Sequence, residues 1–255
     1  MAGGRVVKLA AVLLLLLHTA QAQTRPRSRE EQPEWRKLLE RYLQNVQRDR
    51  TLLRDVTMEV QIQAELPRLK KSGRLWAIRS ISRLGEVTYR ALSFIGDNTV
   101  KNDVIARFIK AEVDASGEEK RRSIAITTEN YKFRYVCSYG APGWRLHLFQ
   151  LTPRQRRVGL FEGWVWVEEE SALPVREAGR LVKSPSVFLK RVEFQRDYDI
   201  RQGIAVPAQL VTNIQTRLVG PANIQVTFGN VKFNGQQPRL ARIGLTGSGS
   251  AETGP

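Results

Sequence analysis

Apolar and polar residues alternate along most of the chain, beginning near residue 57. The clearest run is 57–64, where every second residue is apolar, which is the period of a strand with one buried face. Similar alternation returns at 131–139, 158–168 and 188–198, and turn-forming Gly and Pro residues separate these runs. The runs predict about ten strands at short spacing, a pattern typical of an antiparallel meander.

Two segments have a helical period instead. From residue 33 to about 50, apolar residues recur at spacings of three and four after a proline that suits a first helical turn; they are Trp35, Leu38, Leu39, Tyr42 and Val46. A second helix is predicted from 99 to about 115, because Asp97, Asn98 and Thr99 can cap it before a new apolar period that ends near Gly117.

Together these elements predict a mainly β fold. A sheet of this many strands twists and curls, so the expected architecture is a strongly curved antiparallel meander, either a half barrel or a nearly closed barrel. Both helices are predicted to cap its concave side. The apolar stripe of the 33–50 helix has no other surface to cover in a chain of strands.

The two ends of the chain are predicted to lie outside this domain. Residues 1–22 have the pattern of a cleaved signal peptide: Arg5 and Lys8, then the apolar run 9–17, then Ala20-Gln21-Ala22 as the cleavage site. That run is shorter than the ~20 residues that cross a bilayer, and an uncleaved amphipathic anchor is the alternative. Residues 23–32 are predicted to be a flexible leader, 33–240 the folded domain and 241–255 a flexible Gly/Ser-rich tail. The protein is therefore expected to be periplasmic or otherwise exported.

The charge favours polyanionic partners. The 255 residues hold 41 Lys and Arg against 25 Asp and Glu, and without residues 1–22 a net charge of about +14 remains. Such a charge attracts the anionic head groups of a membrane, whereas export makes nucleic acid an unexpected partner. The basic residues gather at predicted turns, at 68–74, 120–122 and 154–157. They are either solvated hairpin tips that prevent edge pairing or a docking surface for an anionic bilayer, and the predicted docking residues are Arg154, Arg156 and Arg157.

Residues able to carry chemistry are scarce. His147 is the one histidine after residue 22, and it lies in a strand pattern with no catalytic motif around it, so it is predicted to be structural or on the surface. The acidic run 168–170 is predicted to be a solvated turn. Cys137 is predicted to be a buried, inert thiol on the apolar face of its strand, with an intermolecular disulfide as the alternative. No enzyme activity, cofactor or metal is expected.

A family resemblance follows from the order of elements and from several short motifs. The first helix leads directly into the strand Thr57-Met58-Glu59-Val60-Gln61-Ile62, and a basic turn is followed by Val158-Gly159-Leu160, Val165-Trp166-Val167-Glu168 and Leu173-Pro174. This layout, with 180–185 and Val206-Pro207 downstream, resembles the periplasmic lipoprotein-sorting, or LolA-like, carriers over residues 33–235. The chain departs from that family in the 96–117 insertion, in its tail and in the Glu-Glu-Ser-Ala turn. The resemblance implies a half barrel with a lipid cavity.

The leading functional hypothesis is a non-enzymatic carrier of the acyl chains of a lipoprotein or lipid. Aromatic residues at alternate strand positions either fill a closed core or line an apolar cavity in an open half barrel. For the open case the predicted lining is Trp76, Ile78, Phe133, Tyr135, Trp164 and Trp166, with both helices as lids and both tryptophans of 164–166 facing inward. The alternatives are an envelope sensor or scaffold of the same fold, with an envelope protein as partner, and an outer-membrane β-barrel protein.

Overall fold

The computed structural model describes residues 33–141, 143–217 and 220–234. All of them except Pro33 belong to one unit, Glu34–Pro255. The predicted signal peptide, leader and tail lie outside the described residues.

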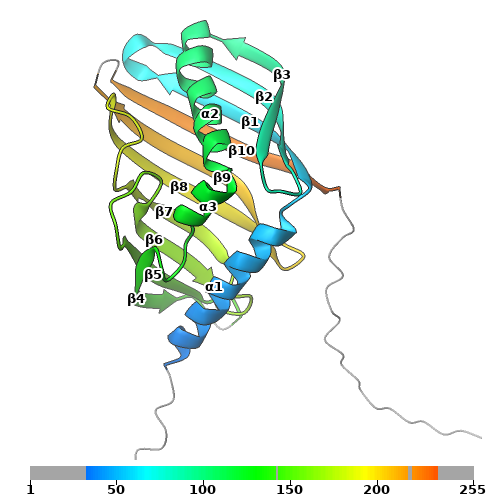
Figure 1. Ribbon diagram of the computed structural model, residues 1–255, viewed down its shortest axis with the longest axis vertical. Coiled ribbons are helices and arrows are strands. Elements are labelled where there is room, and N and C mark those ends of the chain that lie inside the picture. The colour runs from blue at the N-terminus through cyan, green and yellow to red at the C-terminus, as the bar shows by residue number, and fades with distance from the viewer. Residues whose placement is uncertain (1–32, 142, 218–219, 235–255) are drawn as a thin grey trace, which may run out of the picture. The chain divides into compact units, whose positions relative to one another are not determined.

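The described chain forms ten strands and three α-helices (Figure 1). The helices are α1 (Glu34–Leu52), α2 (Ala106–Ala115), which continues a π-helical turn η2 (Val100–Ile105), and α3 (Glu118–Ser123), and a short 3-10 turn, η1 (Pro67–Leu69), follows the first strand. The strands are β1 (Val56–Leu66), β2 (Lys71–Ile81), β3 (Val87–Gly96), β4 (Tyr131–Tyr139), β5 (Leu146–Pro153), β6 (Phe161–Glu168), β7 (Pro174–Leu181), β8 (Leu189–Arg201), β9 (Ile204–Thr216) and β10 (Pro221–Phe233).

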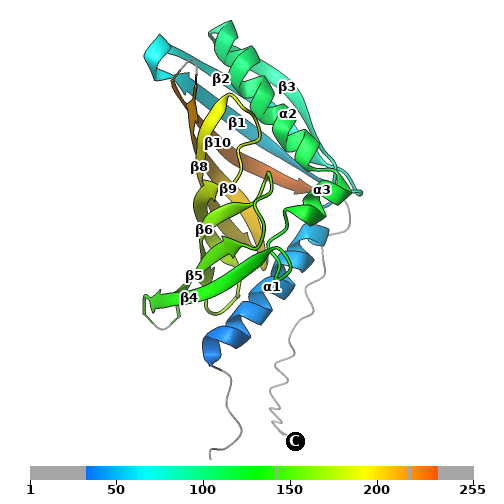
Figure 2. The same cartoon turned by 60° about the vertical axis from the view of Figure 1, so that its left-hand side comes forward.

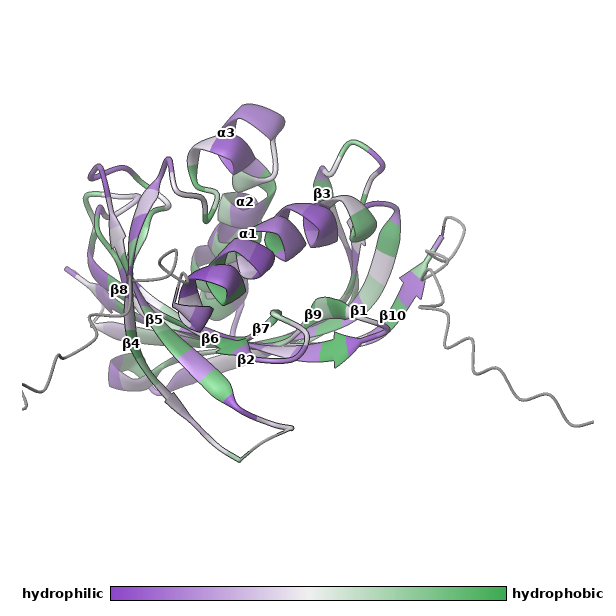
Figure 3. Cartoon of the chain, turned by 90° about the horizontal axis from the view of Figure 1, so that it is seen from below, coloured by the Kyte–Doolittle hydropathy of each residue, from purple (hydrophilic) through white to green (hydrophobic). Residues whose placement is uncertain are grey.

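All ten strands belong to one antiparallel sheet. Its order is β3-β2-β1-β10-β9-β8-β7-β6-β5-β4, so all adjacent strands are consecutive in sequence except β1 and β10. The sheet is open, with β3 and β4 as its edges, and it curves around the helices (Figure 2, Figure 3). The predicted half barrel is confirmed.

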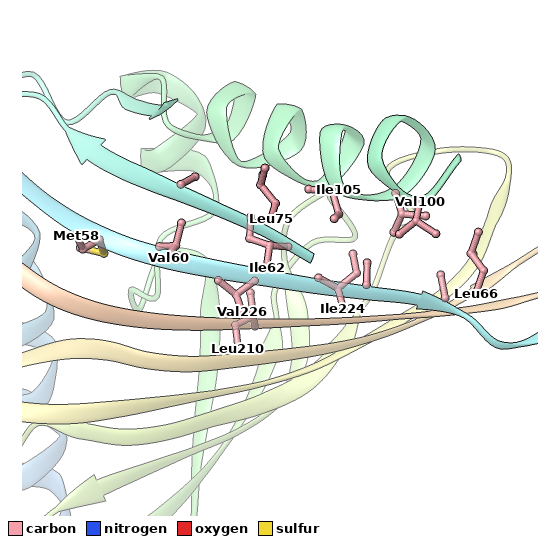
Figure 4. Packing of buried hydrophobic residues seen from close by; sticks show 14 of the residues in the cluster. Met58, Val60, Ile62, Leu66, Leu75, Val100, Ile105, Leu210, Ile224 and Val226 are labelled. Atoms are coloured by element: carbon pink, nitrogen blue, oxygen red, sulfur yellow. The ribbon is translucent and has the colours of Figure 1, made fainter. Parts of the chain in front are cut away.

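The helices divide the concave face into two apolar clusters. The η2 turn packs Val100 and Ile105 against Ile62 and Leu75 on the β1–β3 side (Figure 4). On the other side, α1 buries Leu38 and Tyr42 among residues of β4, β5 and β6. The prediction that the 33–50 helix packs on the concave side is confirmed.

The short helix α3 was not predicted from the sequence, which places a basic turn at 120–122. Its first turn carries Glu118 and Glu119, and its last turn carries Lys120, Arg121 and Arg122. Acidic residues near the N-terminus and basic residues near the C-terminus both favour a helix through its dipole. This charge order therefore explains why a helical turn forms here.

Polar side chains of α1 fasten the helix to the turns at one end of the sheet. Arg48 donates to the carbonyl of Gly203 at 2.7 Å, and Asn45 donates to the carbonyl of Ser171 at 2.9 Å. The buried carboxylate of Asp49 accepts a hydrogen bond from the backbone N–H of Ala205 at 2.9 Å. Because β9 and β10 pair no further than Gln209 and Thr227, Asp49 supplies an acceptor at the point where the strands have parted.

We expect Asp49→Ala to lower the free energy of unfolding by about 1–3 kcal/mol, because the buried N–H of Ala205 loses its acceptor. Urea denaturation of both proteins measures this difference. The matched control is Asp103→Ala, which removes an exposed ion pair with Arg107 and should change the free energy by less than about 0.5 kcal/mol. Equal effects of the two variants would show that Asp49 does not hold α1 in place.

Candidate functional site

One row of side chains crosses the concave face through all ten strands. From β4 to β3 it consists of Tyr135, Phe149, Val165, Glu177, Arg196, Leu210, Val226, Ile62, Leu75 and Phe94. Every member is aromatic or aliphatic except the two in the middle. An acid and a base therefore lie side by side at the centre of an apolar surface.

Glu177 and Arg196 form an ion pair between β7 and β8. Arg196 Nη1 lies 3.3 Å from Glu177 Oε2 and 3.4 Å from the hydroxyl of Tyr198. The side chain of Glu177 is 6% exposed, whereas that of Arg196 is 41% exposed. The carboxylate is thus buried beneath a guanidinium that water can still reach.

Helix α1 brings two further polar groups to this pair. The Tyr42 hydroxyl is fully buried, and it has no hydrogen-bond partner among the described residues. Burial raises the pKa of Tyr42 well above its usual value, and the charge of Glu177 raises it further. Burial lowers the pKa of Arg50, while Tyr42, Glu177 and Tyr198 oppose that change. These shared effects place both α1 residues in the electrostatic field of the central pair.

Phe194 joins the polar centre to both apolar clusters. It lies two residues from Arg196 on the same face, and it packs against the cluster under α1 and against the cluster under η2. Its ring meets that of Phe161 edge to face, with centroids 5.0 Å apart. The site therefore combines an ionic centre with apolar surfaces, an arrangement suited to a ligand that has a polar head and an apolar chain.

The structure brings two of the six predicted cavity residues to the concave face. Tyr135 stacks on Trp35 of α1, with ring centroids 5.7 Å apart, and Phe133 packs beside Tyr131 at 6.4 Å. Both belong to the apolar cluster under α1. Here the inward aromatic rings fill space against the helix.

The other four predicted cavity residues, Trp76, Ile78, Trp164 and Trp166, lie on the opposite, outer face. In β2 the deeply buried positions are Leu75 and Ala77, and in β6 they include Val165 and Val167. Successive side chains of a strand point to opposite faces. The tryptophans of β6 must then point outward, and Trp164 is 44% exposed. The prediction that Trp164 and Trp166 face inward is wrong.

Each predicted docking arginine donates a hydrogen bond within the protein. Arg154 reaches the carbonyl of Thr128 at 2.8 Å, Arg156 that of Val182 at 2.9 Å, and Arg157 the side-chain oxygen of Asn130 at 2.8 Å. All three side chains are exposed. They support the loops around the β5–β6 connection, and docking to a bilayer stays a prediction.

The predicted burial of Cys137 is wrong, because its thiol is exposed. The register between β4 and β5 shifts between Tyr135 and Cys137, so Cys137 pairs with Leu148 and leaves the face that Tyr135 occupies. An extra residue at such a bulge reverses the alternation beyond it. A strict period of two applied to 131–139 therefore places Cys137 on the wrong side.

His147 is buried, in keeping with a structural role. Its Nε2 is 3.6 Å from Glu169 Oε1, which is too long for a hydrogen bond, and its ring lies 5.9 Å from that of Tyr135.

In the acidic run 168–170, the carboxylate of Glu168 accepts the backbone N–H of Ser171 at 2.7 Å. Burial alone would raise the pKa of Glu168, but hydrogen bonds from Ser171 and Glu170 lower it. The acidic run thus forms a turn that is held by its own hydrogen bonds.

Two open hollows border the β8–β9 turn, and they have volumes of about 400 and 420 Å³. The first lies between that turn and the end of β10, and the second lies beside the polar face of α1.

Within the described ranges, no group of three or more His, Cys, Asp or Glu residues is placed to bind a metal. None of the described helices is both long and apolar enough to span a membrane.

No family model matches the sequence, and no curated protein matches it. Among solved structures, a LolA superfamily protein from Nitrosomonas europaea is 12% identical with a TM-score of 0.38, and the match covers 76% of this chain and 94% of that chain. An outer membrane lipoprotein-sorting protein domain from Vibrio parahaemolyticus is 9% identical with a TM-score of 0.41, covering 82% and 96%. The MucA/MucB complex of Pseudomonas aeruginosa gives 10% identity and a TM-score of 0.25, covering 78% and 99%.

The first two of these structures are named as a LolA superfamily protein and a lipoprotein-sorting domain, the group that the sequence resembles. The TM-scores are below 0.5 and the identities below 25%. These likenesses therefore say nothing of what this chain binds.

Proposed function

We propose that the protein is an exported, non-enzymatic carrier that binds the acyl chain of a lipid or lipoprotein on its concave face, between α1 and α2. The observation that carries this proposal is the partial exposure of β8. Its inward side chains Val192, Phe194, Arg196 and Tyr198 are only half-buried, whereas the inward residues of β1 and β6 are buried. A strip of the concave face is thus left accessible between two covered halves.

An acyl chain on this strip would gain about 0.8 kcal/mol for each methylene that leaves water. A few methylenes against Phe194 and Val192 would already give useful affinity. The helices act as lids in this proposal, and a longer chain displaces apolar side chains of α1 from the strip. The predicted residues Phe133 and Tyr135 then contribute to binding from beneath α1.

Mass spectrometry of organic extracts from the purified full chain tests the proposal. We expect acyl-chain lipids at close to one equivalent in the wild type and a clear loss in Phe194→Asp. The matched control is Trp164→Asp on the outer face, which should retain the lipid. Wild-type protein that carries no lipid and binds no added fatty acid would overturn the carrier function.

A carrier must also contact a membrane. The net charge of about +14 that remains without residues 1–22 favours an anionic membrane. We expect simultaneous replacement of Arg154, Arg156 and Arg157 by Gln to weaken binding to anionic vesicles by up to ~3 kcal/mol, since each basic residue at the surface contributes on the order of 1 kcal/mol. Vesicle co-sedimentation at several salt concentrations measures the effect. The charge-matched control replaces Arg90, Lys101 and Arg107 by Gln. Equal losses in both triple variants would assign the attraction to net charge alone.

A second candidate function is an envelope scaffold that binds a protein partner, favoured by exposed apolar residues on and near β4 and β6. Val136, Tyr139, Trp144 and Trp164 are each at least 41% exposed. Clustered exposed apolar residues mark interaction sites more often than isolated ones do. Delipidated protein that binds an envelope protein, and moves no lipid between vesicles, would favour this candidate over the carrier.

A further inference from the structure

We propose that the polar centre of the concave face is a head-group site for an anion, so that the ligand is an amphiphile with a phosphate or carboxylate head. This inference rests on the proposed carrier function and specifies its ligand. The site consists of Arg50 and Tyr42 from α1 and of Arg196, Tyr198 and Glu177 from the sheet.

The charge of the site favours an anion. Glu177 is held by Arg196, and this pair is neutral overall. Arg50 adds a second guanidinium; the residue is exposed, and Tyr42, Glu177 and Tyr198 are among its electrostatic neighbours. Arg50 therefore adds one positive charge near the neutral pair, and no carboxylate of the described residues forms an ion pair with it.

The Tyr42 hydroxyl is a second and independent observation. It is fully buried, it has no hydrogen-bond partner among the residues that the structure describes, and Glu177, Tyr198 and Arg50 are its electrostatic neighbours. A buried hydroxyl without a hydrogen bond is costly, and such groups are uncommon in folded proteins. An oxygen of a bound head group would accept the hydroxyl proton and remove this cost.

The chemistry of arginine decides which anion fits. A guanidinium presents a planar fork of donors that matches the oxygens of a carboxylate or phosphate, and it is less strongly hydrated than an ammonium. Arg196 is fixed by Glu177 and still 41% exposed, so part of its fork is available. The ring of Phe194 lies beside it, with its centroid 5.9 Å from Arg196 Cζ, and the apolar side chains around Phe194 would receive the chain of the same ligand.

Isothermal titration calorimetry with four probes tests the inference: inorganic phosphate, and dodecyl phosphate, dodecanoate and dodecyl maltoside below their critical micelle concentrations. We expect the two anionic amphiphiles to bind at least tenfold more tightly than the maltoside. Arg50→Gln should weaken dodecyl phosphate about tenfold and leave the maltoside unchanged, whereas Arg50→Lys should retain most of the affinity.

The remaining outcomes separate the two proposals. Equal affinity for charged and neutral heads, unchanged by Arg50→Gln, would overturn the head-group site and leave the carrier function standing. Failure of every amphiphile to bind would overturn both. Inorganic phosphate that binds as tightly as dodecyl phosphate would also overturn the inference, because the site would then serve a free anion.

The role of the Tyr42 hydroxyl can be tested separately, through the melting temperature and the affinity for dodecyl phosphate. We expect Tyr42→Phe to leave the melting temperature of delipidated protein unchanged or raised, and to weaken dodecyl phosphate severalfold. The matched control is Tyr131→Phe, because the Tyr131 hydroxyl accepts the backbone N–H of Phe161 at 3.3 Å, and its loss should lower the melting temperature. A lowered melting temperature in Tyr42→Phe, with unchanged affinity, would show that the hydroxyl serves the fold and not a ligand.

Discussion

Replacing Val165 by Asp is expected to unfold the protein, whereas replacing its neighbour Trp164 by Asp is expected to leave it folded. Val165 has no exposed surface and lies in the apolar cluster under α1. A carboxylate there would be buried without a partner, a change that costs upwards of about 4 kcal/mol. Trp164 lies one residue away on the outer face and is 44% exposed, so a carboxylate there stays in water.

Circular dichroism during thermal unfolding measures both variants under the same conditions. A folded Val165→Asp protein together with an unfolded Trp164→Asp protein would reverse the assignment of the two faces of β6. It would also return the tryptophans to the concave side, where the sequence pattern had placed them.

The second large effect concerns the ion pair at the centre of the row. Removing the carboxylate in Glu177→Ala leaves Arg196 unpaired on an apolar surface. Breaking a fully buried pair costs about 3–5 kcal/mol, and because Arg196 is 41% exposed we expect roughly 2 kcal/mol here. Urea denaturation of the delipidated protein measures the loss.

The double variant Glu177→Met with Arg196→Met is the informative partner of this experiment. It restores an apolar row, and replacing an ion pair by apolar residues of similar size is often neutral or stabilising. We therefore expect wild-type stability or better, together with loss of the preference for anionic amphiphiles. If the double variant keeps that preference, the pair has no part in head-group recognition.

The strands and the first two helices could be predicted from the sequence because alternation and helical period are local signals. In β6, however, the local sequence does not determine which side chains face the concave side. Trp164 and Trp166 alternate with Val165 and Val167, so both faces of the strand are apolar. Size favours the tryptophans for the interior, but the fold buries the valines beneath α1, where the sheet meets the helix closely.

The central ion pair could not be predicted, because it depends on register. Glu177 and Arg196 are 19 residues apart in sequence and become neighbours only through the pairing of β7 with β8. The unpartnered Tyr42 hydroxyl is equally invisible in sequence, since Tyr42 reads simply as part of an apolar helix stripe. A signal was present all the same: Arg196 lies between Phe194 and Tyr198 on the apolar side of its strand.

Photo-cross-linking with a diazirine-labelled fatty acid, followed by mass spectrometry of the peptides, tests the central claim most directly. The carrier account predicts that labels fall on β8 between Val192 and Tyr198 and on α1 near Tyr42, and that excess dodecanoate removes them. Labels on Trp164 and Trp166 of the outer face, or labels that dodecanoate does not displace, would contradict it.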